Sequence, residues 1–297
     1  MKMDIEKGVA FYGNPKQDAY VPRIAEFLAR VRELGMGVYV SREFGEYLTA
    51  RGHDVTSEIA DEFPEEKVHT LVSIGGDGTF LRAAQWAGAS GVPMIGINTG
   101  HLGFMASYSF DDEAEILQLL AEDTRCLERR MVLKVECSGM PEGFWPYALN
   151  EVALLKSDSA SMVTVRTWID GEYLAAYESD GLIIASPTGS TAYNMSVGGP
   201  ILEPTVSNMV LSPVAPHSLT MRPLVIGGDS EVRAEVSCGQ RRYRVSLDGR
   251  TFRLRGDPSD EKDAIKITKA PFTVNVLRRP GKGFPEILRD KLLWAKR

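Results

Sequence analysis

A glycine-rich segment with one acidic residue follows an apolar run early in the chain. Residues 75–79 read Gly-Gly-Asp-Gly-Thr, between the apolar run 68–74 and a helical pattern that starts at Phe80. A glycine-rich turn between a strand and a helix can bind phosphate, because the backbone can approach the anion and the first N–H groups of the helix face it. The spacing matches neither GxGxxG nor GxxxxGK[ST], so the segment is not a P-loop.

Asp77 is the unusual residue of this segment. A carboxylate beside a bound phosphate is repelled unless it binds a metal ion, accepts a hydroxyl proton or holds a sugar hydroxyl. The alternative is a tight turn in which Asp77 caps the following helix. The five residues by themselves leave both interpretations open.

Two further polar segments follow apolar runs. Residues 98–104 read Asn-Thr-Gly-His-Leu-Gly-Phe after the strand-like run 94–97, and a stretch rich in Ser, Thr and Gly at 186–200 follows the run 182–185. Ligands of open α/β sheets lie at the carboxyl ends of the strands, and small hydroxyl groups suit phosphate or ribose oxygens. Each segment alone is also compatible with an ordinary loop.

The elements that must position these segments differ along the chain. Before Met131, apolar strands at 8–12, 37–40, 68–74 and 94–98 alternate with amphipathic helices. This alternation is typical of a parallel sheet with helices on both faces. After Met131 strand-like segments succeed one another, with Asp-Gly hairpin signals at 170–171 and 248–249, which predicts a mostly-β sandwich or layered sheet. A helix is expected from Pro285 onward.

Length and composition limit the function classes. A chain of 297 residues suggests one large or two ordinary domains, and 43% hydrophobic with 25% charged residues is globular composition. The net charge of −6 disfavours nucleic acid or an anionic membrane as partner. With no apolar run of about 18 residues, no signal core and three scattered cysteines, we expect a cytoplasmic protein. The four scattered histidines suggest no metal site built by the protein.

Taken together, the motifs resemble the NAD kinase family, whose members phosphorylate NAD to NADP. The matching segments are GGDGT at 75–79, NTGHLGF at 98–104, Asn150-Glu151 and SDGLIIASPTGSTAYNMSVGGP at 179–200. Lipid kinases and phosphofructokinases share a loop similar to GGDG, whereas the long block at 179–200 is specific. The resemblance extends from residue 8 to the C-terminal segment.

The resemblance implies a fold and a domain organisation. We expect an α/β protein with a Rossmann-like parallel-sheet domain at 1–128 and a β-rich, sandwich-like dinucleotide-binding domain at 129–275. The tail at 276–297 would return its helix to the first domain. The dinucleotide would bind between the two domains.

The resemblance also implies roles for individual residues. Asp77 would engage the 2′-hydroxyl of the adenosine ribose and accept its proton, and Arg82 would neutralise phosphate. Phe104 would lie on the adenine side, and Asn150 with Glu151 would bind the nicotinamide-bearing part. The phosphate loop is Gly75, Gly76, Gly78 and Thr79; the remaining substrate-binding residues are Gly78, Asp180, Thr191, Ala192, Tyr193 and Ser196.

Three positions depart from the family pattern. Ser161 and Glu178 stand where basic residues are common, and Arg250 replaces the glutamine of a DGQ motif. A lost cation and a gained carboxylate affect how phosphate is bound at that rim. We interpret Arg250 as a compensating cation.

The expected reaction transfers the terminal phosphoryl group of ATP to NAD. A divalent cation, expected to be Mg²⁺, would be held mainly by the nucleotide phosphates. The resemblance further implies a homo-oligomer, a dimer or tetramer. Polyphosphate as donor, NADH as acceptor and feedback by NADP stay open.

Three competing functions remain alternatives. A lipid or sugar kinase could share the GGDG loop, but this alternative predicts an apolar acyl pocket and no need for the segment 191–196. A non-catalytic dinucleotide sensor would bind NAD or NADP and transfer nothing. A β-rich interaction protein would require four separate loops to match by coincidence.

Overall fold

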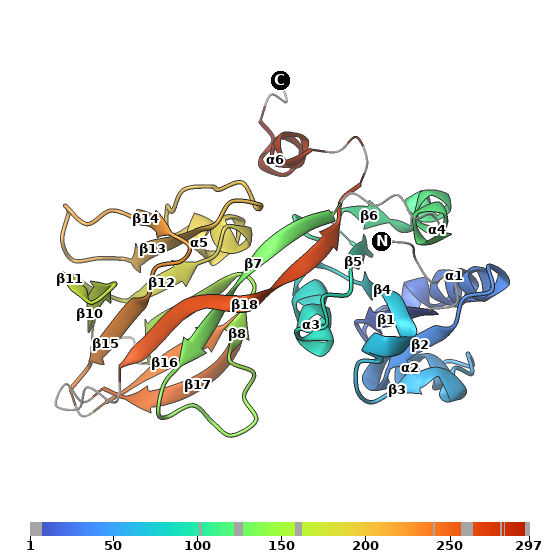
Figure 1. The fold of residues 1–297 in the computed structure, drawn as a ribbon, viewed down its shortest axis with the longest axis horizontal. Helices are drawn as coiled ribbons and strands as arrows, with labels where there is room; N and C mark the ends of the chain where they lie inside the picture. The colour runs from blue at the N-terminus through green and yellow to red at the C-terminus, as the bar shows by residue number, and fades with distance from the viewer. Residues whose placement is uncertain are drawn as a thin grey trace. The chain divides into compact units, whose positions relative to one another are not determined.

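The computed structural model describes residues 8–100, 103–121, 127–157, 162–239, 241–256, 264–279, 281 and 283–294. The chain forms two compact units, here called unit 1 (Met1–Arg129 with Val274–Arg297) and unit 2 (Arg130–Thr273). Figure 1 shows the elements of both.

Unit 1 contains a parallel sheet flanked by helices. Its strands lie in the order β3-β2-β1-β4-β5, and neighbouring strands pair in parallel. The strands are β1 (Gly8–Gly13), β2 (Val38–Ser41), β3 (Ile59–Ala60), β4 (Val68–Ile74), β5 (Met94–Asn98) and β6 (Tyr108–Ser109), which pairs with β5. The helices are α1 (Val21–Glu33), α2 (Arg42–Thr49), α3 (Asp77–Ala87) and α4 (Glu113–Ala121).

The helices of unit 1 pack through the apolar positions that the sequence spaces at helical intervals. In α1, Ile24, Phe27, Leu28 and Val31 are buried, and Pro22 lies in the first turn, where its missing N–H costs little. They share one core with alternate residues of the sheet and with α2 and α4. Helix α3 packs on β1, β4 and β5. The predicted α/β architecture is confirmed.

The strand order places a topological switch point between β1 and β4. From β1 the chain adds β2 and β3 on one side, and it then continues with β4 on the other side of β1. The loop after β1 meets the end of β4, since the Asn14 N–H and the Gln17 side chain donate to the Ile74 carbonyl at 3.2 and 2.9 Å. Ligands of such sheets bind at this edge.

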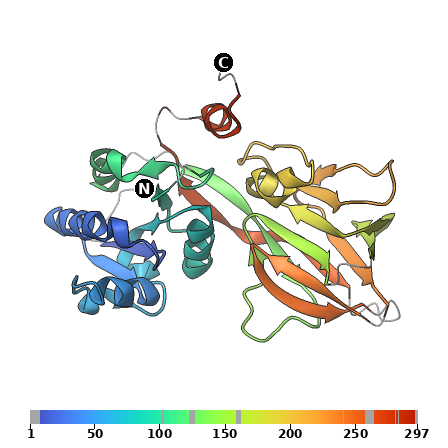
Figure 2. The ribbon, with the colours of Figure 1, turned by 180° about the vertical axis from the view of Figure 1, so that it is seen from behind.

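Unit 2 is built from antiparallel sheets. One sheet has the order β14-β13-β12-β9-β16-β17, and another contains β11, β10, β15 and β18 with β7 and β8. Figure 2 shows these strands from behind. The bounds are β7 (Leu127–Glu136), β8 (Tyr147–Ala148), β9 (Glu151–Lys156), β10 (Val163–Ile169), β11 (Glu172–Ser179), β12 (Gly181–Ala185), β13 (Asn208–Val214), β14 (Leu224–Gly227), β15 (Val232–Ser237), β16 (Arg242–Leu247), β17 (Arg250–Arg255) and β18 (Ile265–Leu277).

The sheets of unit 2 share an apolar core, and tight turns set their register. Alternate residues such as Leu154, Val165, Ile184 and Val245 are fully buried in one cluster. Both Asp-Gly pairs form hairpins with left-handed backbone, with φ of 51° and 84° at 170–171 and 49° and 82° at 248–249. These values fit the two-residue turns that favour Asp-Gly. The predicted mostly-β sandwich is confirmed.

The C-terminal segment belongs to unit 1. Strand β18 pairs with β15 through Ile265–Ile267 and with β5 through Val276. Helix α6 (Phe284–Leu292) follows, with Pro285 in its first turn and basic residues in its last turn. Over the described ranges, every helix is too short or too polar to span a bilayer.

Candidate functional site

The GGDGT segment forms the turn from β4 into α3. All residues of β4 are buried, and Gly76 is the N-cap of α3 with φ −84° and ψ −174°. A side chain at Gly76 or Gly78 would meet no described atom within 4 Å, so the backbone there is open to a ligand. The buried Thr79 lies against Gly75, whose φ of +147° suits glycine.

Asp77 is the first residue of α3, and its carboxylate binds the loop after β5. Oδ2 accepts the Phe104 N–H at 2.9 Å, and Oδ1 accepts the Met105 and Ala106 N–H groups at 3.1 Å each. The helix cap is Gly76, so the interpretation of Asp77 as a cap is wrong. Because its bonds reach another loop, Asp77 joins the GGDGT turn to the segment that carries Phe104.

Gly103 makes this contact sterically possible. A Cβ atom at residue 103 would lie 1.8 Å from Asp77 Oδ1. Any side chain there must displace the carboxylate or the loop. Phe104 itself is half-buried. The two motifs that resemble the family's therefore form one structural group in unit 1.

Arg82 lies on the same helix, past the first turn of α3. It is exposed, and its guanidinium donates a hydrogen bond to the Tyr12 hydroxyl. Burial raises the pKa of Tyr12, and the charge of Arg82 opposes that shift. Arg82 and Tyr12 line a cavity that also includes Trp86.

In unit 2, Asn150 and Glu151 lie against the hydroxyl-rich segment that follows β12. Strands β9 and β12 pair so that Glu151 is opposite Ala185, and the Ser186 N–H donates to the Asn150 carbonyl at 2.8 Å. A Cβ atom at Gly189 would lie 2.0 Å from that carbonyl oxygen, so only glycine permits this approach. The Tyr193 N–H donates to the Glu151 carboxylate.

The segment 188–196 consists of a 3-10 turn (Thr188–Thr191) and a short helix, α5 (Tyr193–Ser196). Thr191 and Ala192 are half-buried, whereas Tyr193 and Ser196 are exposed. The anchor of the segment is Asn194, a residue that sequence analysis missed. Its buried amide donates to the Ser190 and Pro200 carbonyls at 3.0 Å each and accepts from the Ser212 hydroxyl at 2.6 Å.

A second residue missed by the sequence analysis holds the Asn-Glu pair in place. The Asp248 carboxylate accepts the Leu149 N–H at 2.7 Å on Oδ2, and the Asn150 and Glu151 N–H groups at 2.8 and 3.1 Å on Oδ1. Burial raises the pKa of Asp248, and the three N–H groups and Arg250 oppose that shift. The sequence offered two signals for it, the Asp-Gly hairpin and the resemblance of residues 248–250 to a DGQ motif, but neither gave Asp248 a role in the site.

Several polar atoms in this part of unit 2 lack a hydrogen-bond partner. Asn150 Oδ1, Glu151 Oε2 and Thr188 Oγ1 are buried and meet no partner among the residues that the structure describes. Burial, with the charge of Asp248, raises the pKa of Glu151 to about 7. Buried acceptors without partners are costly, so these atoms mark a place where a ligand with N–H or O–H donors fits.

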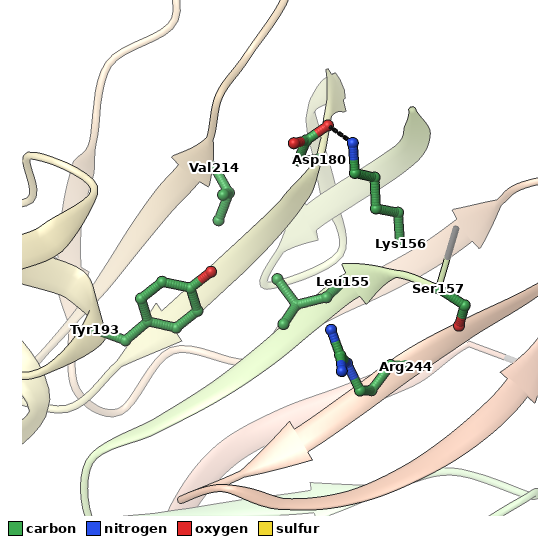
Figure 3. A pocket seen from close by; sticks show the side chains of 7 residues that line it. All are labelled: Leu155, Lys156, Ser157, Asp180, Tyr193, Val214 and Arg244. Atoms are coloured by element: carbon green, nitrogen blue, oxygen red, sulfur yellow. Dashed lines mark ion pairs between the residues drawn. The ribbon is translucent and has the colours of Figure 1, made fainter. Parts of the chain in front are cut away.

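Asp180 lies apart from these atoms but lines a cavity with Tyr193. Lys156 and Asp180 form an ion pair, drawn as a dashed line in Figure 3. Its atoms, Lys156 Nζ and Asp180 Oδ1, are 2.6 Å apart. In that view Tyr193 and Arg244 approach the same space, with Leu155 between them. The cavity measures about 290 Å³ and is lined by Leu155, Lys156, Ser157, Asp180, Tyr193, Val214 and Arg244. Lys156 and Arg244 are cations that sequence analysis missed.

The structure gives Arg250 a different role from the compensating cation we expected. Its guanidinium donates to the Trp145 and Tyr147 carbonyls at 2.8 and 2.5 Å and lies over the rings of Phe144 and Trp145. Burial lowers the pKa of Arg250, and the charge of Asp248 opposes this. Glu178 is exposed, and Ser161 lies outside the described residues.

Each unit thus assembles its own group of the predicted residues. Unit 1 holds Gly75, Gly76, Asp77, Gly78, Thr79, Arg82 and Phe104, and unit 2 holds Asn150, Glu151, Asp180, Thr191, Ala192, Tyr193 and Ser196. In the part of the chain that the structure describes, no three His, Cys, Asp or Glu side chains gather to bind a metal ion.

Comparison with known proteins identifies the family. The family model of the ATP-NAD kinase N-terminal domain matches residues 9–125, and that of the ATP-NAD kinase C-terminal domain matches residues 149–279. An NAD kinase of Porphyromonas gingivalis is 38% identical over 292 residues, which cover 97% of this chain and 98% of the relative. One from Flavobacterium psychrophilum is 37% identical over 298 residues, with the same coverage.

Solved structures agree with this assignment. Yeast NADH kinase complexed with NADH has the same fold, with a TM-score of 0.83 at 23% identity over 98% of this chain and 89% of that one. An NAD kinase from Archaeoglobus fulgidus in complex with ATP has a TM-score of 0.69 at 29% identity, covering 92% and 94%. The chain therefore belongs to the NAD kinase family.

Proposed function

We propose that this protein transfers the terminal phosphoryl group of ATP to the 2′-hydroxyl of the adenosine ribose of NAD and so forms NADP. Membership of the NAD kinase family supports this reaction. The observation that carries it is the group of buried acceptors at Asn150, Glu151 and Thr188 without partners among the described residues. Ribose hydroxyls and a carboxamide supply the donors that such acceptors need.

Asp77 is the residue we assign to the attacking hydroxyl. Phosphoryl transfer depends mainly on positioning and on charge neutralisation, so a fixed carboxylate is more useful than a mobile one. Asp77 is fixed by three backbone N–H groups, and Oδ2 accepts only one of them. That oxygen keeps capacity to accept a hydroxyl hydrogen bond and then the proton.

The phosphates of the donor fit the open turn at Gly76 and Gly78. The backbone there is accessible, and the N-terminus of α3 favours negative charge. We infer that ATP enters as its Mg²⁺ complex, with the ion held mainly by the phosphates. The ion is thus part of the substrate, and its removal by a chelator should abolish turnover.

The competing functions predict different surroundings for the ligand. A lipid kinase needs an apolar pocket for acyl chains, whereas the cavities beside Asp180 and beside Arg82 are lined by several charged side chains. This lining favours a nucleotide over a lipid. A dinucleotide sensor would bind the same ligand, and only turnover separates it from a kinase.

The test is a reaction of purified protein in which NAD and NADH are each combined with ATP, polyphosphate or no donor. NADP or NADPH is then measured with a dehydrogenase specific for the 2′-phosphorylated form. We expect product with ATP. Binding of NAD without product would support the sensor, and phosphorylation of diacylglycerol instead of NAD would support the lipid kinase.

We further infer that the protein acts as a homo-oligomer, a dimer or tetramer, in the cytoplasm. The family resemblance supports the assembly, and the acidic net charge disfavours nucleic acid and anionic membranes as partners. Light scattering of the purified protein tests the assembly, since a monomer at assay concentration would contradict it.

A further inference from the structure

Unit 1 contains a cavity beside Arg82 whose aromatic rings have no role in the reaction described above. It measures about 470 Å³, within the usual range for small-molecule sites. Its lining combines three aromatic rings with polar side chains: Tyr12, Asp61, Glu62, Phe63, Arg82, Gln85 and Trp86.

Two of the three rings come from the same edge of the sheet as the GGDGT turn, and the third comes from the helix that starts at that turn. Tyr12 is near the carboxyl end of β1, Phe63 follows β3, and Trp86 lies on α3, which follows β4. These strands belong to one parallel sheet, so their carboxyl ends share one edge. Ligands of open α/β sheets bind at that edge, beside the switch point between β1 and β4.

The aromatic rings present an accessible apolar surface. Trp86 lies edge to face with Phe63, with ring centroids 5.1 Å apart, and 5.9 Å from Tyr12. All three side chains are half-buried, whereas Phe44 of the same unit is fully buried in the core. A planar ring that enters the cavity would cover aromatic surface now open to water.

The polar groups are arranged for a ligand with a neutral head and an anionic tail. Arg42 forms an ion pair with Asp61, which offsets that acidic charge beside the cavity. Glu62 and the Gln85 amide supply acceptors and donors for the edge of a base. Arg82, held by the Tyr12 hydroxyl, supplies a positive charge one turn before Trp86 on α3.

The spacing along α3 connects the cavity to the phosphate turn. Trp86 is nine residues after Asp77, which corresponds to about 13 Å along the helix axis. An extended nucleoside triphosphate has this scale, so its base and its terminal phosphates can occupy the two places together.

We propose that the Tyr12–Phe63–Trp86 cavity binds the purine base of a nucleoside triphosphate whose phosphates extend along α3 to the GGDGT turn. This inference rests on the proposed function and deepens it, because it makes a nucleotide, and not polyphosphate alone, the donor. It also separates the donor's base from the adenine of NAD, which we expect near Phe104.

The principal test measures binding without turnover. Calorimetry with the Mg²⁺ complex of ATP, with tripolyphosphate and with NAD is carried out on the wild type, Trp86→Ala and Trp86→Phe. Loss of one base–aromatic stacking contact should weaken ATP binding by about 5- to 150-fold in Trp86→Ala. Trp86→Phe should restore most of it, and the affinities for NAD and tripolyphosphate should stay near wild type.

The control and a second readout exclude a simple folding defect. Trp168→Ala removes a tryptophan of unit 2 that packs on Tyr173 and should leave ATP binding unchanged. ATP should alter the tryptophan fluorescence of the wild type but not of Trp86→Phe, which keeps a ring in the cavity. A fluorescence change that persists in Trp86→Phe would contradict the proposal.

The remaining outcomes each contradict a stated part of the proposal. Weaker NAD binding with unchanged ATP binding in Trp86→Ala would place the acceptor in the cavity. Equal losses for ATP and tripolyphosphate would show that Trp86 affects the phosphates and not the base. Absence of NADP formation by the wild type would overturn the proposed function, whereas the binding series would still test the cavity.

Discussion

Two aspartates, one in each unit, hold the loops that carry the predicted substrate residues. Asp77 binds the N–H groups of residues 104–106, and Asp248 binds those of residues 149–151. In both, Oδ1 accepts two of the N–H groups and Oδ2 accepts the third. The same hydrogen-bond pattern therefore occurs once in a parallel sheet and once in an antiparallel one.

The surroundings of the two carboxylates differ. Both side chains are half-buried, but only Asp77 adjoins the open backbone of Gly76 and Gly78. Burial raises the pKa of Asp248, which lies between Arg250 and Glu151. A substrate hydroxyl can therefore reach Asp77, whereas Asp248 acts through the residues that it positions. The open backbone beside the carboxylate, more than its burial or the number of its hydrogen bonds, separates a candidate catalytic group from a positioning group.

The largest expected effect separates the two roles directly. Asp77→Asn should lower kcat by about 10² or more, the usual scale for a positioned base, while NAD affinity changes by less than about tenfold. Steady-state kinetics and NAD titration measure both quantities. Turnover equal to that of the wild type would remove Asp77 from the chemistry.

Asp248→Asn should act mainly on stability and on the KM for NAD. The amide places an N–H group against backbone donors, which should cost about 2 to 3 kcal/mol of unfolding free energy. Because Asn150 and Glu151 lose their anchor, KM should rise more than kcat falls. Chemical denaturation and initial-rate kinetics check this.

The chain offers a matched control for this variant. Asp170 stands at the same place in the other Asp-Gly hairpin of unit 2, and its carboxylate accepts one N–H, from Glu231 at 2.8 Å. Asp170→Asn should leave the KM for NAD unchanged. Similar effects of the two substitutions would reduce Asp248 to an ordinary turn residue.

The sequence could predict the elements whose signals are local. The runs 68–74 and 94–98 coincide with β4 and β5, in which every residue is buried, including the few polar ones. Both Asp-Gly hairpins were predicted because their left-handed turns favour that pair. Strand β3 has only two residues, Ile59 and Ala60, which is too short for any periodicity to appear.

The site could be predicted only in part, because its bonds connect distant residues. Family resemblance indicated which segments matter, but Asp248 bonds to residues 97 to 99 positions earlier in the chain. Asn194 was overlooked because its role depends on Ser212 in a neighbouring strand. The role expected for Arg250 was wrong since its charge meets carbonyls more than 100 positions away.

The pH dependence of stability tests whether Asp248 also influences the protonation of Glu151, which lies in the loop that Asp248 binds. The pKa of Glu151 is raised from 4.5 to about 7, so the folded protein holds a proton that the unfolded chain releases. The contribution of Glu151 to the free energy of unfolding is therefore fully present below about pH 4.5, and it is lost as the pH rises toward 7. The difference should be roughly 3 kcal/mol.

Unfolding measured between pH 4.5 and 8 in the wild type and in Glu151→Gln checks this sign. The wild type should lose stability relative to the variant as the pH rises through about 7. Above that pH the difference in unfolding free energy between the two proteins should stay constant. Asp248→Asn should reduce the loss, because it removes the neighbouring charge. A stability difference that increases in favour of the wild type with pH would contradict the assignment.

The smallest expected effect concerns the fit between Asp77 and its loop. In Gly103→Ala the new methyl group meets Asp77 Oδ1, so the carboxylate or the loop must move. A displacement of this kind should lower kcat by about tenfold, less than removal of the carboxylate itself. Gly100→Ala is the control, since its Cβ would lie 3.7 Å from Asn98 Oδ1, an ordinary contact. If both variants turn over like the wild type, the Asp77 carboxylate does not need its three backbone hydrogen bonds for activity. The similarity between Asp77 and Asp248 would then be structural and would carry no consequence for catalysis.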